Sequence, residues 1–299
     1  MFGDDGVTPP KFRPFTAAFY GVLLISRKPV AAAVLFAVSL VLATLAAWAG
    51  FTAYWQLGLG EAGMGLSLGQ AGIGLGLGLA ALALQLSISA AWLRFLVRGE
   101  AGLFPFRLGD DEGRLLLTVL LQSLILLLAI LPAILPVAAL ALVDSLVADV
   151  VFPHAIAIAP VFIAFVWAGV RVSAMPALAI RDRRIWGLEA WSVTRGVFWT
   201  ALLGYLVVLA IGEFIPFSGS GLTGQFRLMS DMDLEAVASL WRSPDAAGML
   251  SWMALAVLTL TAHILGLGYS AYIARWDALQ EREPVADDAL LRMRDVAAS

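Results

Sequence analysis

The chain has 299 residues, of which 61% are hydrophobic and only 14% are charged, and its mean hydropathy is +0.89. Soluble domains carry about a quarter charged residues, so this composition excludes an ordinary water-soluble globular protein and indicates a surface that faces lipid. There is no cysteine, which excludes disulfides, thiolate metal sites and a cysteine nucleophile, and the formal net charge of −3 favours no particular partner.

The N-terminal region precedes the first long apolar stretch. It begins with the acidic run Met1 to Asp5 and lacks the basic-then-apolar order of a signal peptide, so we expect no cleaved leader. A shorter apolar segment ends at Arg27, Lys28 and Pro29, and two adjacent cations before a proline do not suit a helix interior in lipid. The pattern predicts an interfacial helix over 14–27 and then a turn, with one long tilted helix as the alternative.

Six apolar stretches are long enough to cross a bilayer. A helix needs roughly twenty apolar residues to cross a hydrocarbon core about 30 Å thick. The sequence therefore predicts an all-α fold: a polytopic membrane helix bundle of about six transmembrane helices, with interfacial amphipathic helices beside it. The predicted spans are 29–53, 71–95, 115–142, 155–180, 197–217 and 249–274.

The predicted organisation has three parts. They are a cytoplasmic N-terminus with an interfacial helix at 1–28, a six-helix transmembrane domain at 29–275, and a cytoplasmic tail at 276–299. Two further short helices are expected, Leu234 to Arg242 in an outer loop and Asp287 to Val296 in the tail.

Lysine and arginine set the predicted orientation, because they concentrate in cytoplasmic loops. Only Arg227 and Arg242 fall on one side of the predicted spans, and Arg171 lies within the fourth. All other lysines and arginines fall on the opposite side. We therefore expect both termini in the cytoplasm, in a bacterial inner (plasma) membrane.

Glycine and proline mark particular positions in the second and third spans. Gly72, Gly74, Gly76 and Gly78 form two overlapping GxxxG pairs, which allow close backbone approach within the bundle or between subunits. They do not form a nucleotide loop, since no strand-turn-helix context surrounds them. Pro132 and Pro136 predict a kink in the third span.

The segment between the fourth and fifth spans is rich in arginine and tryptophan. Indole rings lie at the headgroup level of a membrane, and guanidinium groups meet its phosphates. We predict a short interfacial helix in this segment that contacts lipid or a partner, either as a docking surface for anionic lipid or as a simple anchor. The predicted contacts are Arg183, Arg184, Trp186, Trp191, Arg195 and Trp199.

Four polar residues lie inside predicted spans, namely Arg171, Ser173, Glu213 and His263. A charge at the centre of a membrane helix costs roughly 2.5–3.5 kcal/mol on insertion scales. One interpretation is a relay of Arg171, His263 and Glu213 through a polar cavity. The alternative is structural: Arg171 reaches the inner headgroups, Glu213 reaches the outer interface, and His263 bonds a neighbouring carbonyl.

The same region carries a resemblance. Arg171, Ser173 and Pro176, followed by Trp191 with Thr194 to Trp199, resemble a pattern of bacterial membrane families. These are the membrane domain found beside some glycerophosphodiester phosphodiesterases and the YciC-like six-helix proteins. A weaker similarity runs from Trp92 to Glu112. The resemblance implies a six-helix inner-membrane protein but not the phosphodiesterase, which resides in a separate soluble barrel with histidine and acidic motifs.

Catalytic patterns are not visible in the sequence. The acidic runs at 110–112 and 231–235 are predicted to be solvated loops and helix caps, and the second does not fit an EF-hand. We expect no enzyme, no metal, no cofactor and no nucleic-acid partner. The favoured function is a non-enzymatic scaffold, assembly factor or lipid- and partner-organising subunit, with the bilayer and a membrane protein or second copy as partners. The alternative is a transporter or permease of a small or lipid-like solute; an intramembrane enzyme ranks third.

Overall fold

The computed structural model describes residues 11–56, 68–100, 109–146, 154–214 and 256–280. These parts of the chain are almost entirely helical and contain no strand. The labelled elements are α1 (Pro14–Ala18), α2 (Tyr20–Arg27), α3 (Pro29–Gln56), α4 (Leu68–Leu93), the π-helical turn η1 (Arg94–Arg98), α5 (Asp110–Leu146), α6 (His154–Val172), α7 (Met175–Asp182), α8 (Ala190–Val193) and α9 (Phe198–Phe214). A further helix, Ala256–Gln280, is called the 256–280 helix.

Five helical segments are long and apolar enough to cross a membrane. They are Pro29–Gly50, Gly69–Arg98, Asp110–Pro132, Ala159–Asp182 and Ala256–Gln280. The all-α prediction is confirmed, and each of these segments overlaps a predicted span. The remaining predicted span, 197–217, is α9. Its 17 residues rise about 26 Å, slightly less than the hydrocarbon core.

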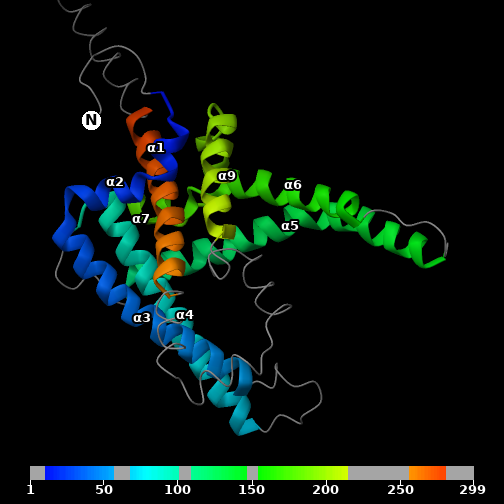
Figure 1. Ribbon diagram of the computed structural model, residues 1–299, viewed down its shortest axis with the longest axis horizontal. Helices are drawn as coiled ribbons and strands as arrows, with labels where there is room; N and C mark the ends of the chain where they lie inside the picture. Colours follow the sequence, from blue (N-terminus) through cyan, green and yellow to red (C-terminus); the bar gives the residue numbers. More distant parts are fainter. Residues whose placement is uncertain (1–10, 57–67, 101–108, 147–153, 215–255, 281–299) are drawn as a thin grey trace, which may run out of the picture.

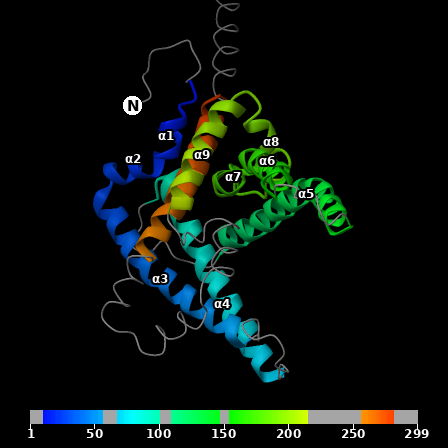
Figure 2. The ribbon, with the colours of Figure 1, turned by 45° about the vertical axis from the view of Figure 1, so that its right-hand side comes forward.

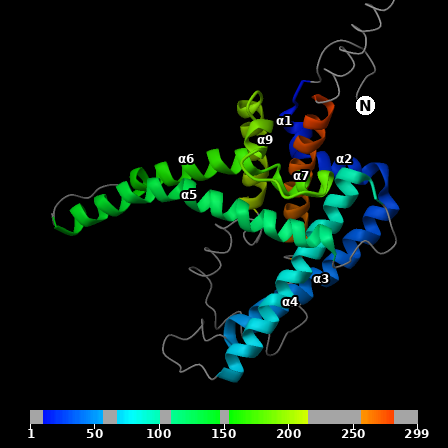
Figure 3. The ribbon, with the colours of Figure 1, turned by 180° about the vertical axis from the view of Figure 1, so that it is seen from behind.

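The long helices form two antiparallel pairs that diverge. α3 runs beside α4, and α5 runs beside α6 (Figure 1). The two pairs leave a shared region in different directions, which is also clear from behind in Figure 3. Leu75, Leu79, Leu127 and Ile163 on these helices are exposed. Apolar surface of this extent calls for lipid or a partner.

Buried residues concentrate where the pairs meet, and we call this region the hub. Trp92, Leu96, Leu178 and Ile273 are among its fully buried side chains. The hub is made of 12–21, 86–98, 109–118, 166–201 and 260–280. It therefore joins segments that are far apart in the sequence, and most of the predicted site residues lie in or beside it.

The N-terminal helix differs from its prediction. The segment 14–27 forms two short helices that break at Phe19. Lys28, with φ −133° and ψ 61°, turns the chain into α3, so the alternative of one continuous helix is wrong. The Tyr20 ring of this segment lies 5.5 Å from that of Tyr272, and the Phe12 ring just before the segment lies 5.1 Å from the same ring. The segment is thus part of the hub, beside α9 and the 256–280 helix (Figures 1 and 2).

The fourth predicted span is also divided. The helix stops at Val172 and restarts at Met175, although 155–180 was predicted as one span. Pro176 explains the break, because it lacks the N–H that would bond the carbonyl of Val172 and its ring crowds that carbonyl. Ser173 Oγ donates to the Val170 carbonyl at 2.8 Å. α5 by contrast remains helical through Pro132 and Pro136, and the predicted kink there stays a prediction.

Several predictions concern residues outside the described parts. The helices expected at 234–242 and 287–296 lie there. So do most of the outer loops and the tail beyond residue 280.

Candidate functional site

Basic side chains of the hub connect its helices to one another through a closed series of hydrogen bonds. Lys28 Nζ, after α2, donates to the Gly99 carbonyl after η1 at 2.9 Å. Arg98 of η1 donates to the Ile180 carbonyl of α7. These two bonds connect α2, η1 and α7, although they involve residues 71 and 82 positions apart in the chain.

Two more arginines close this series. Arg181 of α7 donates to the Ala274 carbonyl of the 256–280 helix and pairs with Asp277 at 3.0 Å. Arg275 of that helix donates to the Tyr20 hydroxyl of α2. The Gly99 and Ile180 carbonyls lie at helix ends, where backbone carbonyls lack intrahelical partners. The basic residues that set the predicted orientation therefore also hold the helix ends together.

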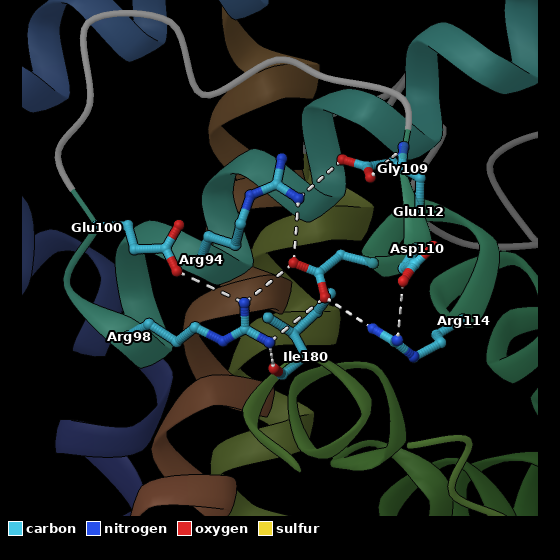
Figure 4. A network of polar contacts seen from close by, with 9 residues as sticks. Arg94, Arg98, Glu100, Gly109, Asp110, Glu112, Arg114 and Ile180 are labelled. Carbon is cyan, nitrogen blue, oxygen red and sulfur yellow. Dashed lines mark hydrogen bonds and ion pairs between the residues drawn. The ribbon is translucent and has the colours of Figure 1, made fainter. Parts of the chain in front are cut away.

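A buried ion-pair network lies between η1 and the start of α5 (Figure 4). Arg94 Nη1 lies 2.8 Å from Glu112 Oε1 and 3.5 Å from Asp111 Oδ2. Arg98 contacts both oxygens of Asp111, at 3.0 and 3.4 Å. Arg114 Nη1 reaches Asp111 Oδ1 at 3.2 Å. The Arg94 side chain is only 1% exposed, so its charge depends on these carboxylates.

The start of α5 explains where the carboxylates lie. The Gly109 N–H donates to Glu112 Oε2 at 3.0 Å, which is one half of a capping box, and acids suit the positive end of the helix dipole. The capping role predicted for 110–112 agrees with this geometry. The solvated role is wrong for Asp111 and Glu112, which are buried, whereas Asp110 is exposed.

Sequence reasoning missed this network as a site. Arg94 and Arg98 stand one helical turn apart and so share a face, and four acids follow within twenty residues, namely Glu100, Asp110, Asp111 and Glu112. That spacing was a usable signal. The sequence did not show that η1 lies against the first turn of α5, where these side chains meet.

Arg171 lies in a second cluster, formed with the segment before α9. Its Nη1 donates to the Trp191 carbonyl and to Thr194 Oγ1, both at 3.4 Å. Its guanidinium carbon is 4.7 Å from the Phe198 ring centroid and 5.9 Å from that of Trp191. Several residues that carry the family resemblance thus meet in space, although they lie on both sides of the intervening turn.

His263 has different surroundings. Its Nε2 lies 3.0 Å from Ser89 Oγ, which joins the 256–280 helix to α4. The Ser89 hydroxyl also lies 2.9 Å from the Gln85 carbonyl and has one proton to donate to it. The geometry is satisfied when His263 Nε2–H donates to Ser89. The predicted carbonyl partner is therefore replaced by a hydroxyl.

The predicted relay is not assembled by any contact among the described residues. Arg171 binds the segment before α9, whereas His263 binds α4. The side chain of Glu213 lies outside the described part of the structure. The relay of these three residues stays a prediction.

The predicted interfacial contacts divide into two groups. Arg183, Arg184, Arg195 and Trp199 are exposed, and Trp199 most of all at 77%. Trp186 is only 6% exposed, and its indole N–H donates to Asp182 at 3.0 Å. This indole packs inside the fold, which differs from the predicted contact with headgroups.

The remaining members of this segment link it to the helices around it. Arg184 stacks on the Trp186 ring at 4.1 Å. Trp191 packs edge-on against Trp167 of α6 at 4.8 Å. The segment is helical only over the four residues of α8, so most of it is turn rather than the predicted short helix.

The four glycines of α4 that were predicted to pack also differ in their surroundings. A Cβ on Gly78 would meet Ala53 of α3 at 3.9 Å, and Gly74 is buried. A Cβ on Gly72 or Gly76 would meet nothing within 4 Å. Gly78 therefore packs within the α3/α4 pair, whereas Gly72 and Gly76 do not. A closer approach of two helix backbones at a glycine lies elsewhere, and the sequence analysis missed it.

That backbone approach joins α2 to the 256–280 helix. A Cβ on Gly268 would lie 2.6 Å from the Gly21 nitrogen and 2.9 Å from its Cα. A Cβ on Gly204 of α9 would lie 2.9 Å from the Pro14 carbonyl oxygen. Glycine at these positions lets α1, α2, α9 and the 256–280 helix pack as one unit.

No metal-binding group appears in this part of the molecule. Among the described residues, no three histidine, cysteine, aspartate or glutamate side chains are grouped to hold an ion. Comparisons with protein-family models, curated proteins and solved structures found no match to the chain. The resemblance to the phosphodiesterase-associated membrane domain therefore stays a prediction.

Proposed function

We propose that this protein is a non-enzymatic membrane scaffold that organises lipid and a partner membrane protein around diverging helix pairs. The observation that carries the proposal is a contrast within the structure. In the hub, charged side chains pair with one another or with backbone carbonyls from other helices. On the helix pairs, large apolar side chains stay exposed.

The paired charges support a structural role for the hub. A catalytic group must reach a substrate with its proton or its lone pair. The carboxylates of Asp111 and Glu112 are instead occupied by guanidinium groups and are nearly inaccessible. We infer that the hub is a structural core from which the helix pairs extend.

The exposed helix surfaces support contact with other molecules in the membrane. Bilayer lipid covers apolar helices without cost. Two pairs that diverge also leave apolar flanks on which another membrane helix can pack, by van der Waals contact and without a need for charge. We place the chain in a bacterial inner membrane with both termini in the cytoplasm, supported by the basic residues that gather at the hub.

The test is site-specific photocrosslinking of the full-length chain. A photoreactive residue at Leu127 of α5 or Ile163 of α6, both exposed, is expected to form one discrete protein adduct in native membranes. The same residue at the buried Leu178 is the matched control and is expected to form none. The adduct partner should co-purify in mild detergent at a fixed ratio. A monodisperse monomer with lipid adducts alone would overturn the scaffold proposal.

A further inference from the structure

Arg171 and Arg195 form a pair of like charges beside the start of α9. Arg171 Nη1 lies 3.4 Å from the hydroxyl of Thr194, the residue before Arg195, and Arg195 is close enough for its charge to act on Arg171. Neither has a carboxylate partner among the described residues, whereas Arg94, Arg98 and Arg181 each have one. Two neighbouring cations repel each other unless an anion lies between or beside them.

The Arg171 guanidinium is already held in place. Nη1 is directed at the Trp191 carbonyl and Thr194 Oγ1, and the group stacks on the Phe198 ring. Its Nε is buried and has no hydrogen-bond partner. A guanidinium has five N–H donors, so donors remain after these contacts. A fixed guanidinium with unused donors matches the oxygens of a phosphate group.

The chain around the pair leaves room for a ligand. Arg195 and Gly196 are exposed, and a Cβ on Gly196 would meet nothing within 4 Å. The first turn of α9 follows directly, and its positive dipole end adds to the attraction for an anion. The helix dipole adds to the attraction of the two arginines for an anion and does not substitute for it.

The surroundings favour a lipid phosphate over a soluble one. Trp199, in the first turn of α9, and Trp167, which packs on Trp191, both expose their indoles. Exposed indoles beside arginines are typical of the headgroup level of a membrane. The apolar surface of α6 continues from this point, with Phe162 and Ile163 exposed, and can cover acyl chains.

We propose that Arg171 and Arg195 bind the phosphate of an anionic glycerophospholipid headgroup, with Trp167 and Trp199 at the boundary with its acyl chains. The proposal deepens the lipid-organising role above and rests on it. The two are read out separately, because partner crosslinking reports on α5 and α6, whereas this site is tested by lipid binding to the purified chain.

The experiment measures phosphatidylglycerol retained by the full-length protein in detergent, by native mass spectrometry. Arg195→Gln removes an exposed cation and should leave the fold intact; we expect about a tenfold or larger loss of affinity, as for a hydrogen bond to a charged group. Arg27→Gln removes an exposed arginine of α2, outside the predicted lipid contacts, and is the matched control, expected to change affinity less than about twofold.

Arg171→Lys provides the second arm. It keeps the charge but loses the planar fork, so phosphatidylglycerol binding should fall while the protein stays monodisperse. Equal losses in Arg195→Gln and Arg27→Gln would overturn the proposal in favour of general surface charge. Unchanged binding in both Arg195→Gln and Arg171→Lys would also overturn it. Displacement of the lipid by inorganic phosphate at equal concentration would assign the site to a soluble anion instead.

Discussion

At the scale of single residues, burial decides which charges matter. Arg94 and Asp110 belong to the same network, but the side chain of Arg94 is 1% exposed and that of Asp110 is 89% exposed. A buried charge without a partner is costly, whereas an exposed ion pair contributes little. The sequence shows both residues as charged and near predicted helix ends, and only the fold separates them.

Replacement of Arg94 by alanine should strongly destabilise the hub. It removes the cation that lies 2.8 Å from the buried Glu112 and one of the three cations beside Asp111, at an expected cost of about 3–5 kcal/mol. Asp110→Ala is the control, with an expected change below about 1 kcal/mol. Unfolding of the detergent-purified protein in SDS measures both. Equal effects of the two substitutions would contradict the account of the network.

The bond between Ser89 and His263 should act as a helix-to-helix contact. We expect a coupling energy of about 0.6 to 1.7 kcal/mol in a double-mutant cycle of Ser89→Ala and His263→Ala, the range for such bonds in membrane proteins. SDS unfolding of the two single variants and the double variant measures it. A coupling energy of zero would show that the bond is not formed. The predicted relay would then be the remaining interpretation of His263.

At the scale of elements, proline and glycine explain the departures from the predicted helices. Pro176 divides the fourth span, and this break could have been predicted from its position near the C-terminal end of the apolar run. The contact of Gly21 with Gly268 could not, because the two residues are far apart in the sequence. GxxxG spacing directed attention to α4, where Gly72 and Gly76 pack against nothing described.

Gly268→Ala and Gly266→Ala should have opposite effects. An alanine Cβ at 268 would overlap the backbone of Gly21, which cannot move without separating the helices, at a cost of about 1–3 kcal/mol. At 266 it would meet nothing within 4 Å. Alanine there should be neutral or stabilise the helix by about 0.5–1 kcal/mol. Thermal unfolding in detergent compares them, and similar melting temperatures would contradict the close approach.

At the scale of the whole molecule, the hub and the diverging helix pairs are stabilised in different ways. The hub is held by buried apolar packing and by charges in mutual contact. The outer parts of α3 to α6 contact mainly one neighbour each, as Figures 1 and 3 show. Their exposed apolar side chains have to be covered by acyl chains or by another protein.

Leu120→Arg tests that exposure. Leu120 is 57% exposed and lies about 15 Å along the span from Asp110, near mid-membrane. An arginine there should cost roughly 2.5–3.5 kcal/mol on insertion and lower the amount of protein in the membrane fraction. Leu120→Ala should leave it unchanged. An abundant, carbonate-extractable Leu120→Arg protein would contradict a membrane location for α5.

The sequence by itself determined that the described chain is helical and which stretches are long and apolar enough to span a membrane. These are local properties, since hydrophobicity and length act within each segment. The tertiary structure decided that Arg94 meets Glu112, that Arg171 meets Thr194 and Phe198, and that Gly268 meets Gly21. Such pairings depend on how distant helices cross and rotate against one another, and a single sequence does not specify that without the packing of all of them.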